Sequence, residues 1–292
     1  MIRRLRHSEI DFLRYQKCLE TSVEQNFYAQ PLVLNHLCPQ WELLVKNDYE
    51  FVMPVPVRRK YGFKFAIMPL FCQQLGISGP SVDFSVHDEF LSFLQGNYRV
   101  AYYAFHYSNR FSISLNQRKN YCIAPNSYPQ QYRSYLKGRK SAVKSAQDLH
   151  LLRPQLEDVL LFIKKHIKGL DKKTDSEKFF TYLNYLNSHK ILSLYGAAND
   201  GVLITLAVTI STHNRLALLQ LVNNEEFRSN NGASFIIDQL LRDHLATHTF
   251  DFMGSSIRGI EIFFKSFGSE LQPYSVIQNG AKDLLKNLFK TS

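Results

Sequence analysis

Alternating hydrophobic and polar residues predict two similar groups of strands, one in each half of the chain. In the first half, a helix over 10–24 precedes three strands, expected over 41–45, 50–57 and 63–69. The second half repeats this plan with strands over 192–198, 202–210 and 216–222. The turn Asn199-Asp200-Gly201 is typical of a β-hairpin. Two meanders of one design, about 150 residues apart, indicate an internal duplication.

Helical periodicity dominates the regions between and after these strands. Residues 128–150 have the spacing of one helix with a basic flank, formed by Arg133, Lys137, Arg139, Lys140 and Lys144. The elements expected after it are helices over 155–168 and 176–187, a helix over 233–248, a short strand over 250–253, a helix over 257–267 and a strand over 271–277. This mixture predicts an α/β (α+β) fold.

The composition is that of a folded protein with room for two domains. The 292 residues are 45% hydrophobic and 21% charged, enough to form a sizeable core. We expect domains over 1–130 and 131–292. No stretch approaches the ~20 apolar residues of a membrane helix, and the N-terminus lacks the apolar core of a signal peptide. These features predict a cytoplasmic protein without membrane insertion.

The net charge indicates which ligands the protein binds, and the cysteine spacing bears on metal binding. The net charge of +10 favours polyanions such as phosphorylated cofactors or nucleic acid. The four cysteines, at positions 18, 38, 72 and 122, are too far apart in sequence to form a Cys-x-x-Cys pair, so no metal is expected.

The most informative segment is a loop of small residues between the strand ending at 222 and the helix starting near 233. Such a loop leaves backbone N–H groups at the helix N-terminus unpaired, and together with the helix dipole they form an anion site. The candidate phosphate-binding residues are Arg228, Asn231, Gly232, Ala233 and Ser234. The alternative is an Asn-Gly turn that only caps the helix.

This order of elements resembles the GNAT acyl-CoA N-acyltransferases, whose pyrophosphate loop reads Gln/Arg-x-x-Gly-x-Gly/Ala. Arg228, Gly232 and Ala233 fit that frame, with Asn231 where the family usually has glycine. Asparagine tolerates a positive φ better than most residues, so the departure is mild.

The whole chain also resembles the Fem-type (FemAB-like), tandem-GNAT group of bacterial acyltransferases and peptidyltransferases. The matching stretches are 53–56, 60–62, 69–71, 73–76, 231–234, 250–255 and 264–268. The resemblance implies two tandem GNAT-like domains, each a mixed, mainly antiparallel sheet flanked by helices. It implies N-acyl transfer from acyl-CoA, held between two splayed central strands, to an unidentified amine. Gln73, Gln74 and Gly76 resemble a decayed counterpart of the loop, so the N-terminal copy is expected to lack its own donor.

Two alternatives stay open. Fem peptidyltransferases take an amino acid from aminoacyl-tRNA to a cell-wall precursor, and tRNA is as polyanionic as CoA. The basic run over 133–144 could bind tRNA, bind the 3′-phosphate of CoA, or form a solvated helix face. The second alternative is a catalytically inactive binding protein of the same fold, because Phe264 occupies the position of the tyrosine acid that GNAT enzymes often use.

Candidate acid–base residues are few. Acylation of an amine needs a base for its proton and hydrogen-bond donors for the carbonyl oxygen. Residues 216–222 contain no carboxylate. Asp251, between two phenylalanines at the end of a strand, is the best remaining base, unless it caps the turn at Ser255 or pairs with a nearby arginine. Tyr274 is the candidate acid, unless it is an ordinary strand tyrosine.

Overall fold

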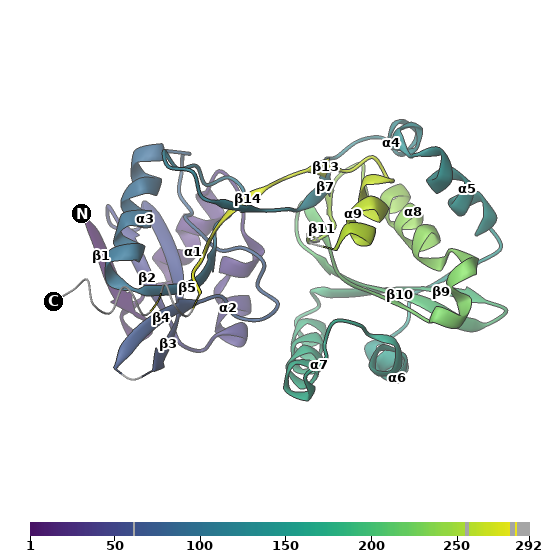
Figure 1. Ribbon diagram of the computed structural model, residues 1–292, viewed down its shortest axis with the longest axis horizontal. Coiled ribbons are helices and arrows are strands. Elements are labelled where there is room, and N and C mark those ends of the chain that lie inside the picture. Colours follow the sequence, from purple (N-terminus) through teal and green to yellow (C-terminus); the bar gives the residue numbers. More distant parts are fainter. Residues whose placement is uncertain (61, 255–256, 281–283, 285–292) are drawn as a thin grey trace. The chain divides into compact units, whose positions relative to one another are not determined.

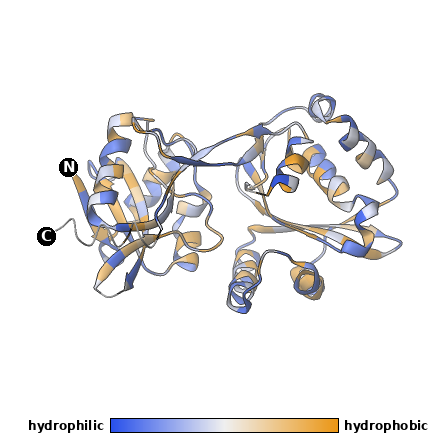
Figure 2. Ribbon diagram, viewed as in Figure 1, coloured by the Kyte–Doolittle hydropathy of each residue, from blue (hydrophilic) through white to orange (hydrophobic). Residues whose placement is uncertain are grey.

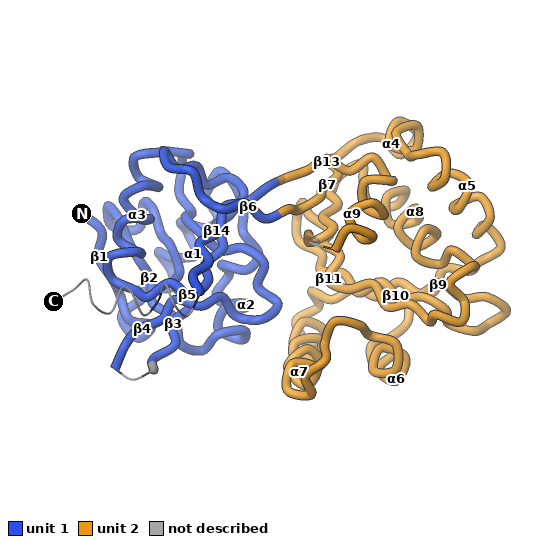
Figure 3. Tube along the Cα trace, viewed as in Figure 1, with its two compact units in different colours: residues 1–118, 273–292 blue, residues 119–272 orange. Residues whose placement is uncertain are grey.

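The computed structural model describes residues 1–60, 62–254, 257–280 and residue 284. The chain divides into two compact units (Figure 3). The first contains residues 1–118 and the segment that begins at Pro273, and the second contains residues 119–272. Each unit is built on one mixed sheet of seven strands flanked by helices (Figure 1). The predicted fold class is therefore confirmed.

The first unit has the strand order β1-β2-β3-β4-β5-β14-β6. Its strands are β1 (Ile2–Arg6), β2 (Trp41–Lys46), β3 (Phe51–Lys60), β4 (Phe63–Ile67), β5 (Arg99–Ala104), β6 (Asn116–Arg118) and β14 (Tyr274–Gln278). Its helices are α1 (Phe12–Thr21), α2 (Pro31–Leu37) and α3 (Phe84–Asn97). All strand pairs are antiparallel except β4 with β5, which is parallel.

The second unit has the strand order β8-β9-β10-β11-β12-β7-β13. Its strands are β7 (Tyr121–Ile123), β8 (His150–Leu152), β9 (Leu192–Asn199), β10 (Val202–Ser211), β11 (Arg215–Asn223), β12 (Thr249–Asp251) and β13 (Glu270–Leu271). Its helices are α4 (Tyr128–Ser134), α5 (Lys137–Ser145), α6 (Leu156–His166), α7 (Lys173–Ser188), α8 (Gly232–His244) and α9 (Arg258–Lys265). Again only one pair, β11 with β12, is parallel.

The two sheets correspond strand by strand, which supports the internal duplication. In each sheet the parallel pair is joined through a helix: α3 connects β4 to β5, and α8 connects β11 to β12. The sixth position of each sheet is filled by a strand from the other half of the sequence, β14 in the first sheet and β7 in the second. This exchange puts the unit boundaries at 118/119 and 272/273. Residue 130, where the sequence suggested the junction, lies in α4.

Hydrophobic residues are concentrated on the strands of both sheets (Figure 2). In the second unit α8 and α9 cover one face of the sheet, and α6 and α7 cover the other (Figure 1). The apolar side of α8 is fully buried, because Ile236, Ile237, Leu240 and Leu241 have no exposed surface. At about 25 cal/mol per Å² of apolar surface, this buried stripe fixes α8 firmly on the sheet. No helix among the described residues is long and apolar enough to span a bilayer.

Two of the elements expected from the sequence were wrong in detail. The single helix over 128–150 is two helices, since Tyr135 and Leu136 are extended and His150 belongs to β8. A tertiary contact favours the break: the Leu136 N–H donates to the Ser266 carbonyl at 3.0 Å. The closing strand over 271–277 is also two strands, β13 and β14, which lie in different sheets.

A buried carboxylate on β2 connects separate segments of the first unit through hydrogen bonds. Glu42 on β2 is 5% exposed and accepts hydrogen bonds from Lys64 Nζ and from the Tyr98 hydroxyl, both at 2.7 Å. Burial alone would raise the pKa of Glu42, but these two hydrogen bonds and the neighbouring cations lower it below its ordinary value. Glu42 is therefore ionised in the folded protein at neutral pH.

Candidate functional site

The parallel strands β11 and β12 separate after a short contact. They pair only over residues 215–217 of β11 and 249–251 of β12. A bulge in the pairing of β10 with β11 leaves Leu219 unpaired, and after β12 the chain turns through left-handed residues Met253 and Gly254. In the described part of the chain, β11 beyond Ala217 has no partner strand on this side. The splayed central strands expected from the resemblance are present.

The N-terminus of α8 follows directly from this open part of β11. A 3-10 segment (Glu225–Asn230) leads to Asn231, which adopts the left-handed conformation with φ 58°. The Asn231 side chain does not cap the helix; its Nδ2 donates instead to Ser145 Oγ and to the Ser229 carbonyl, both at 3.1 Å. Among the described residues, the backbone N–H groups of 232, 233 and 234 have no acceptor. Gly232 and Ser234 are buried and Ala233 is half-buried, and an anion that reached this helix end would satisfy the three donors.

Gly232 has a packing role in this loop. A Cβ atom at this position would lie 2.4 Å from Thr205 Oγ1 on β10. Glycine therefore lets the first turn of α8 lie directly against the sheet.

Arg139 on α5 reaches the same turn of α8 from the side. Its Nε donates to Ser266 Oγ at 2.8 Å, and its Nη1 donates to the hydroxyl of Ser234, a buried residue. The guanidinium also lies over the rings of Phe263 and Phe267, with its carbon 4.3 and 4.7 Å from their centroids. Arg139 belongs to the basic run of the sequence, and no local pattern connects it with the loop.

Arg228, the basic residue of the sequence motif, lies away from these groups. Its side chain is 85% exposed, and its nearest ionic partner is Glu225, at 3.8 Å. Glu225 is in turn 2.6 Å from Lys168 Nζ. The structure thus brings together Asn231, Gly232, Ala233 and Ser234 but leaves Arg228 on the solvent side of the 3-10 segment.

Asp251 is a buried acceptor with three donors. Its Oδ2 is 2.5 Å from Arg215 Nη1, and its Oδ1 accepts from Asn120 Nδ2 at 3.0 Å and from the Met253 N–H at 2.8 Å. The structure thus shows Asp251 paired with an arginine, one of the alternatives left open by the sequence. Residue 255, the other partner considered from the sequence, lies outside the described residues.

The two positions considered for the acid, residues 264 and 274, have different surroundings. Phe264 is buried and stacks on Phe252, with ring centroids 4.4 Å apart, so the side chain at this position belongs to the core. Tyr274 is buried on β14, opposite Arg118 of β6. It therefore belongs to the first unit, whereas Asp251 and the loop belong to the second.

The equivalent loop of the first unit is closed. Beyond β4 the chain continues to bond to β5, since the Met68 N–H donates to the Tyr102 carbonyl at 3.0 Å and the Leu75 N–H to that of Ala104 at 2.9 Å. The N-terminus of α3 is capped by Asp83, which accepts from the N–H groups of residues 85 and 86. A side-chain carboxylate thus occupies the place that an external anion would take.

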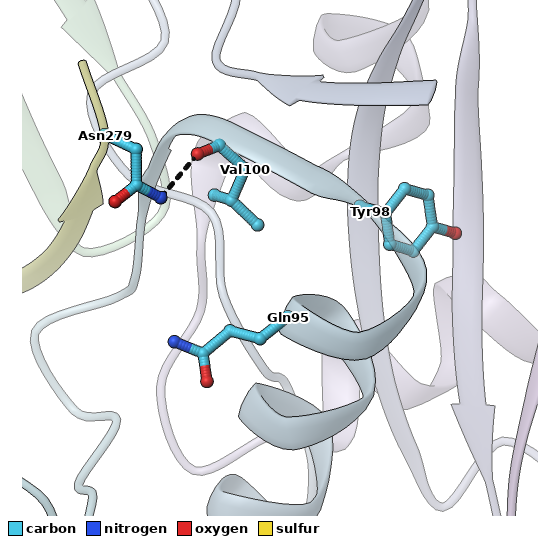
Figure 4. A pocket seen from close by; sticks show the side chains of 4 residues that line it. All are labelled: Gln95, Tyr98, Val100 and Asn279. Atoms are coloured by element: carbon cyan, nitrogen blue, oxygen red, sulfur yellow. Dashed lines mark hydrogen bonds between the residues drawn. The ribbon is translucent and has the colours of Figure 1, made fainter. Parts of the chain in front are cut away.

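The first unit also contains a pocket of about 280 Å³, lined by Gln95, Tyr98, Val100 and Asn279 (Figure 4). Asn279 Nδ2 donates to the Val100 carbonyl at 2.8 Å across its rim. None of the candidate site residues lines this pocket, so it is separate from the loop.

These features define a tandem-GNAT, FemAB-like fold. The chain is similar to FemX, with a TM-score of 0.63 and 11% identity over 98% of this chain and 99% of FemX. It is similar to L-PGS from Bacillus licheniformis, with a TM-score of 0.52 and 9% identity over 96% and 94% of the two chains. It is also similar to a tandem GNAT protein from the clavulanic acid biosynthesis pathway, with a TM-score of 0.50 and 7% identity over 94% and 97%.

No protein-family model and no curated protein matches the sequence. At the identities of the structural matches, the similarity establishes the fold. Activity and substrates have to be argued from this chain's own residues.

Proposed function

We propose that the second unit binds acyl-CoA and transfers its acyl group to an amine. The observation that supports this most strongly is the set of backbone N–H groups of Gly232, Ala233 and Ser234, which have no acceptor among the described residues. They follow the stretch of β11 that pairs with β10 but, in the described part of the chain, has no partner strand on the β12 side. A diphosphate would accept these hydrogen bonds at the positive end of α8, with Asn231 shaping the turn. Arg228 is proposed as an outer, electrostatic contact.

In this reaction the neutral amine attacks the thioester carbon, so that a C–N bond forms and the C–S bond breaks. The amine loses a proton to a base, and the thiolate of CoA leaves and is protonated. Asp251, in the same unit as the loop, stays our prediction for the base. Tyr274 stays our prediction for the acid, although it belongs to the first unit. Because Asp251 already accepts three hydrogen bonds, we expect positioning of the two substrates to supply more of the rate than acid–base chemistry.

The test is a calorimetric titration of the full chain with CoA, followed by release of free thiol from a panel of acyl-CoA donors and amines. Micromolar binding and amine-dependent thiol release are expected. Absence of detectable binding would overturn the proposal. Binding without thiol release for any amine would favour the inactive binding protein, for which the buried Phe264 is the supporting feature.

A Fem-type transfer from aminoacyl-tRNA is the second candidate, and the charge of α4 and α5 favours it. Within the described ranges, none of the basic side chains in this segment is within 4.0 Å of a carboxylate oxygen; they are Arg133, Lys137, Arg139, Lys140 and Lys144. A stripe of unneutralised cations beside the loop fits a phosphate backbone. If tRNA binds and CoA does not, and binding weakens steeply with salt, this candidate replaces the first.

A further inference from the structure

The Arg139 side chain is held in one position beside the first turn of α8. Two serine hydroxyls, Ser234 and Ser266, accept from it, and two phenylalanine rings, Phe263 and Phe267, support its face. A planar guanidinium held by stacking and directed hydrogen bonds loses little further freedom when it binds a ligand. The arrangement is therefore preorganised.

The charge of Arg139 is not balanced by its surroundings. In the described part of the chain no carboxylate oxygen lies within 4.0 Å of it, and its two hydrogen-bond partners are neutral hydroxyls. Burial lowers the pKa of Arg139 to about 10, so the group is still protonated at neutral pH.

The neighbouring helix end adds to this imbalance. The N-terminus of α8 carries about half a positive charge, and a cation beside it is repelled. An anion between a half-buried cation and a positive helix end would stabilise both. We infer that Arg139 binds a phosphate of the donor, together with the N–H groups of residues 232–234.

The hydrogen-bond geometry suits this role. A guanidinium has five N–H donors, and among the described residues Arg139 donates one from Nε and one from Nη1. The other three can make a bidentate contact with phosphate oxygens. This inference rests on the proposed function and adds a specificity: the donor must carry phosphate, and an acyl-pantetheine without it would be a poor substrate.

The experiment compares wild type, Arg139→Gln and a matched control, Lys165→Gln, in calorimetric titrations with CoA and with adenosine 3′,5′-diphosphate. Lys165 is an exposed residue of α6, so its replacement removes the same charge from the same unit at another place. We expect Arg139→Gln to weaken CoA binding at least about tenfold, or about 1.4 kcal/mol. The control should change it less than about twofold.

The outcomes separate this inference from the proposed function. If wild type binds CoA and Arg139→Gln binds it equally well, the inference is wrong and the proposed function stands. If wild type binds no CoA, the proposed function itself fails, and the inference with it. If Arg139→Gln does not fold, Arg139→Lys decides. It keeps the charge but loses the forked contact, so the folded lysine variant should bind CoA severalfold more weakly than wild type. Unchanged binding by the lysine variant would overturn the inference.

Discussion

Replacing Ala233 with aspartate separates the stability of α8 from its binding of an anion. The first unit already has a carboxylate at a helix N-terminus, because Asp83, the residue before α3, accepts from the Ser85 N–H at 2.8 Å. Ala233 is the second residue of α8 and is partly exposed, so an aspartate there has room beside the unpaired N–H groups. Ala233→Asp therefore gives the second unit an anion of its own.

The expected magnitudes have opposite signs for folding and for binding. A carboxylate in the first turn stabilises a helix by about 0.3–1 kcal/mol, which raises the melting temperature of a unit of this size by roughly 1–4 °C. A negative charge about 5 Å from a bound phosphate costs about 3 kcal/mol at an effective dielectric constant of about 20. CoA binding should fall by about two orders of magnitude.

The assay is differential scanning calorimetry combined with titration of CoA, with Ala233→Asn as the neutral control of the same size. We expect the asparagine variant to bind CoA within about fivefold of wild type. Binding of CoA by Ala233→Asp at wild-type affinity would refute the reasoning, because the donor phosphate would then lie elsewhere. A lower melting temperature would show that the helix end is already satisfied.

Three further predictions follow from packing and charge. Gly232→Val should lower the free energy of unfolding by about 2 kcal/mol or more in denaturant titrations, because its side chain meets Thr205; an unchanged midpoint would contradict this. Glu42→Gln should cost about 1–3 kcal/mol at pH 7. Since folding lowers the pKa of Glu42, its contribution is present at neutral pH and is lost as pH falls below about 4, so wild type and variant should converge in acid. Asp251→Ala should cost about 3 kcal/mol because it removes the carboxylate that pairs with the Arg215 guanidinium, and adding Arg215→Met should restore part of this loss. Full thiol-release activity in that double variant would show that Asp251 is not the base.

Local patterns were enough to locate most strands and helices of the second unit. The Asn199–Gly201 turn forms the hairpin between β9 and β10 as expected, because Asp200 and Gly201 adopt the positive φ values that such a turn needs. The strand, loop and helix around residue 231 were also placed correctly. In these segments the hydrophobic spacing and the turn residues act over a few positions, so neighbouring residues carry the signal.

Contacts between distant segments decided what local patterns could not. The helix expected over 128–150 breaks at residues 135 and 136, where a backbone hydrogen bond to Ser266 replaces a helical one. The strand expected over 271–277 divides because its two parts pair with different sheets. Asp251 was considered as a base, and only the fold brings Arg215 and Asn120 onto it.

The amino-acid sequence by itself determined the repeated order of strands and helices and the small-residue loop before α8, since these depend on periodicity and on residue size. Only the tertiary structure showed that α3 is capped by its own Asp83 while α8 is not. It also placed Arg139 beside that uncapped end, 95 residues away along the chain from Ser234. Charge balance depends on which groups lie close together in space. The loop before α8 therefore differs from its counterpart before α3 because α5 packs on α8, and no sequence motif shows this.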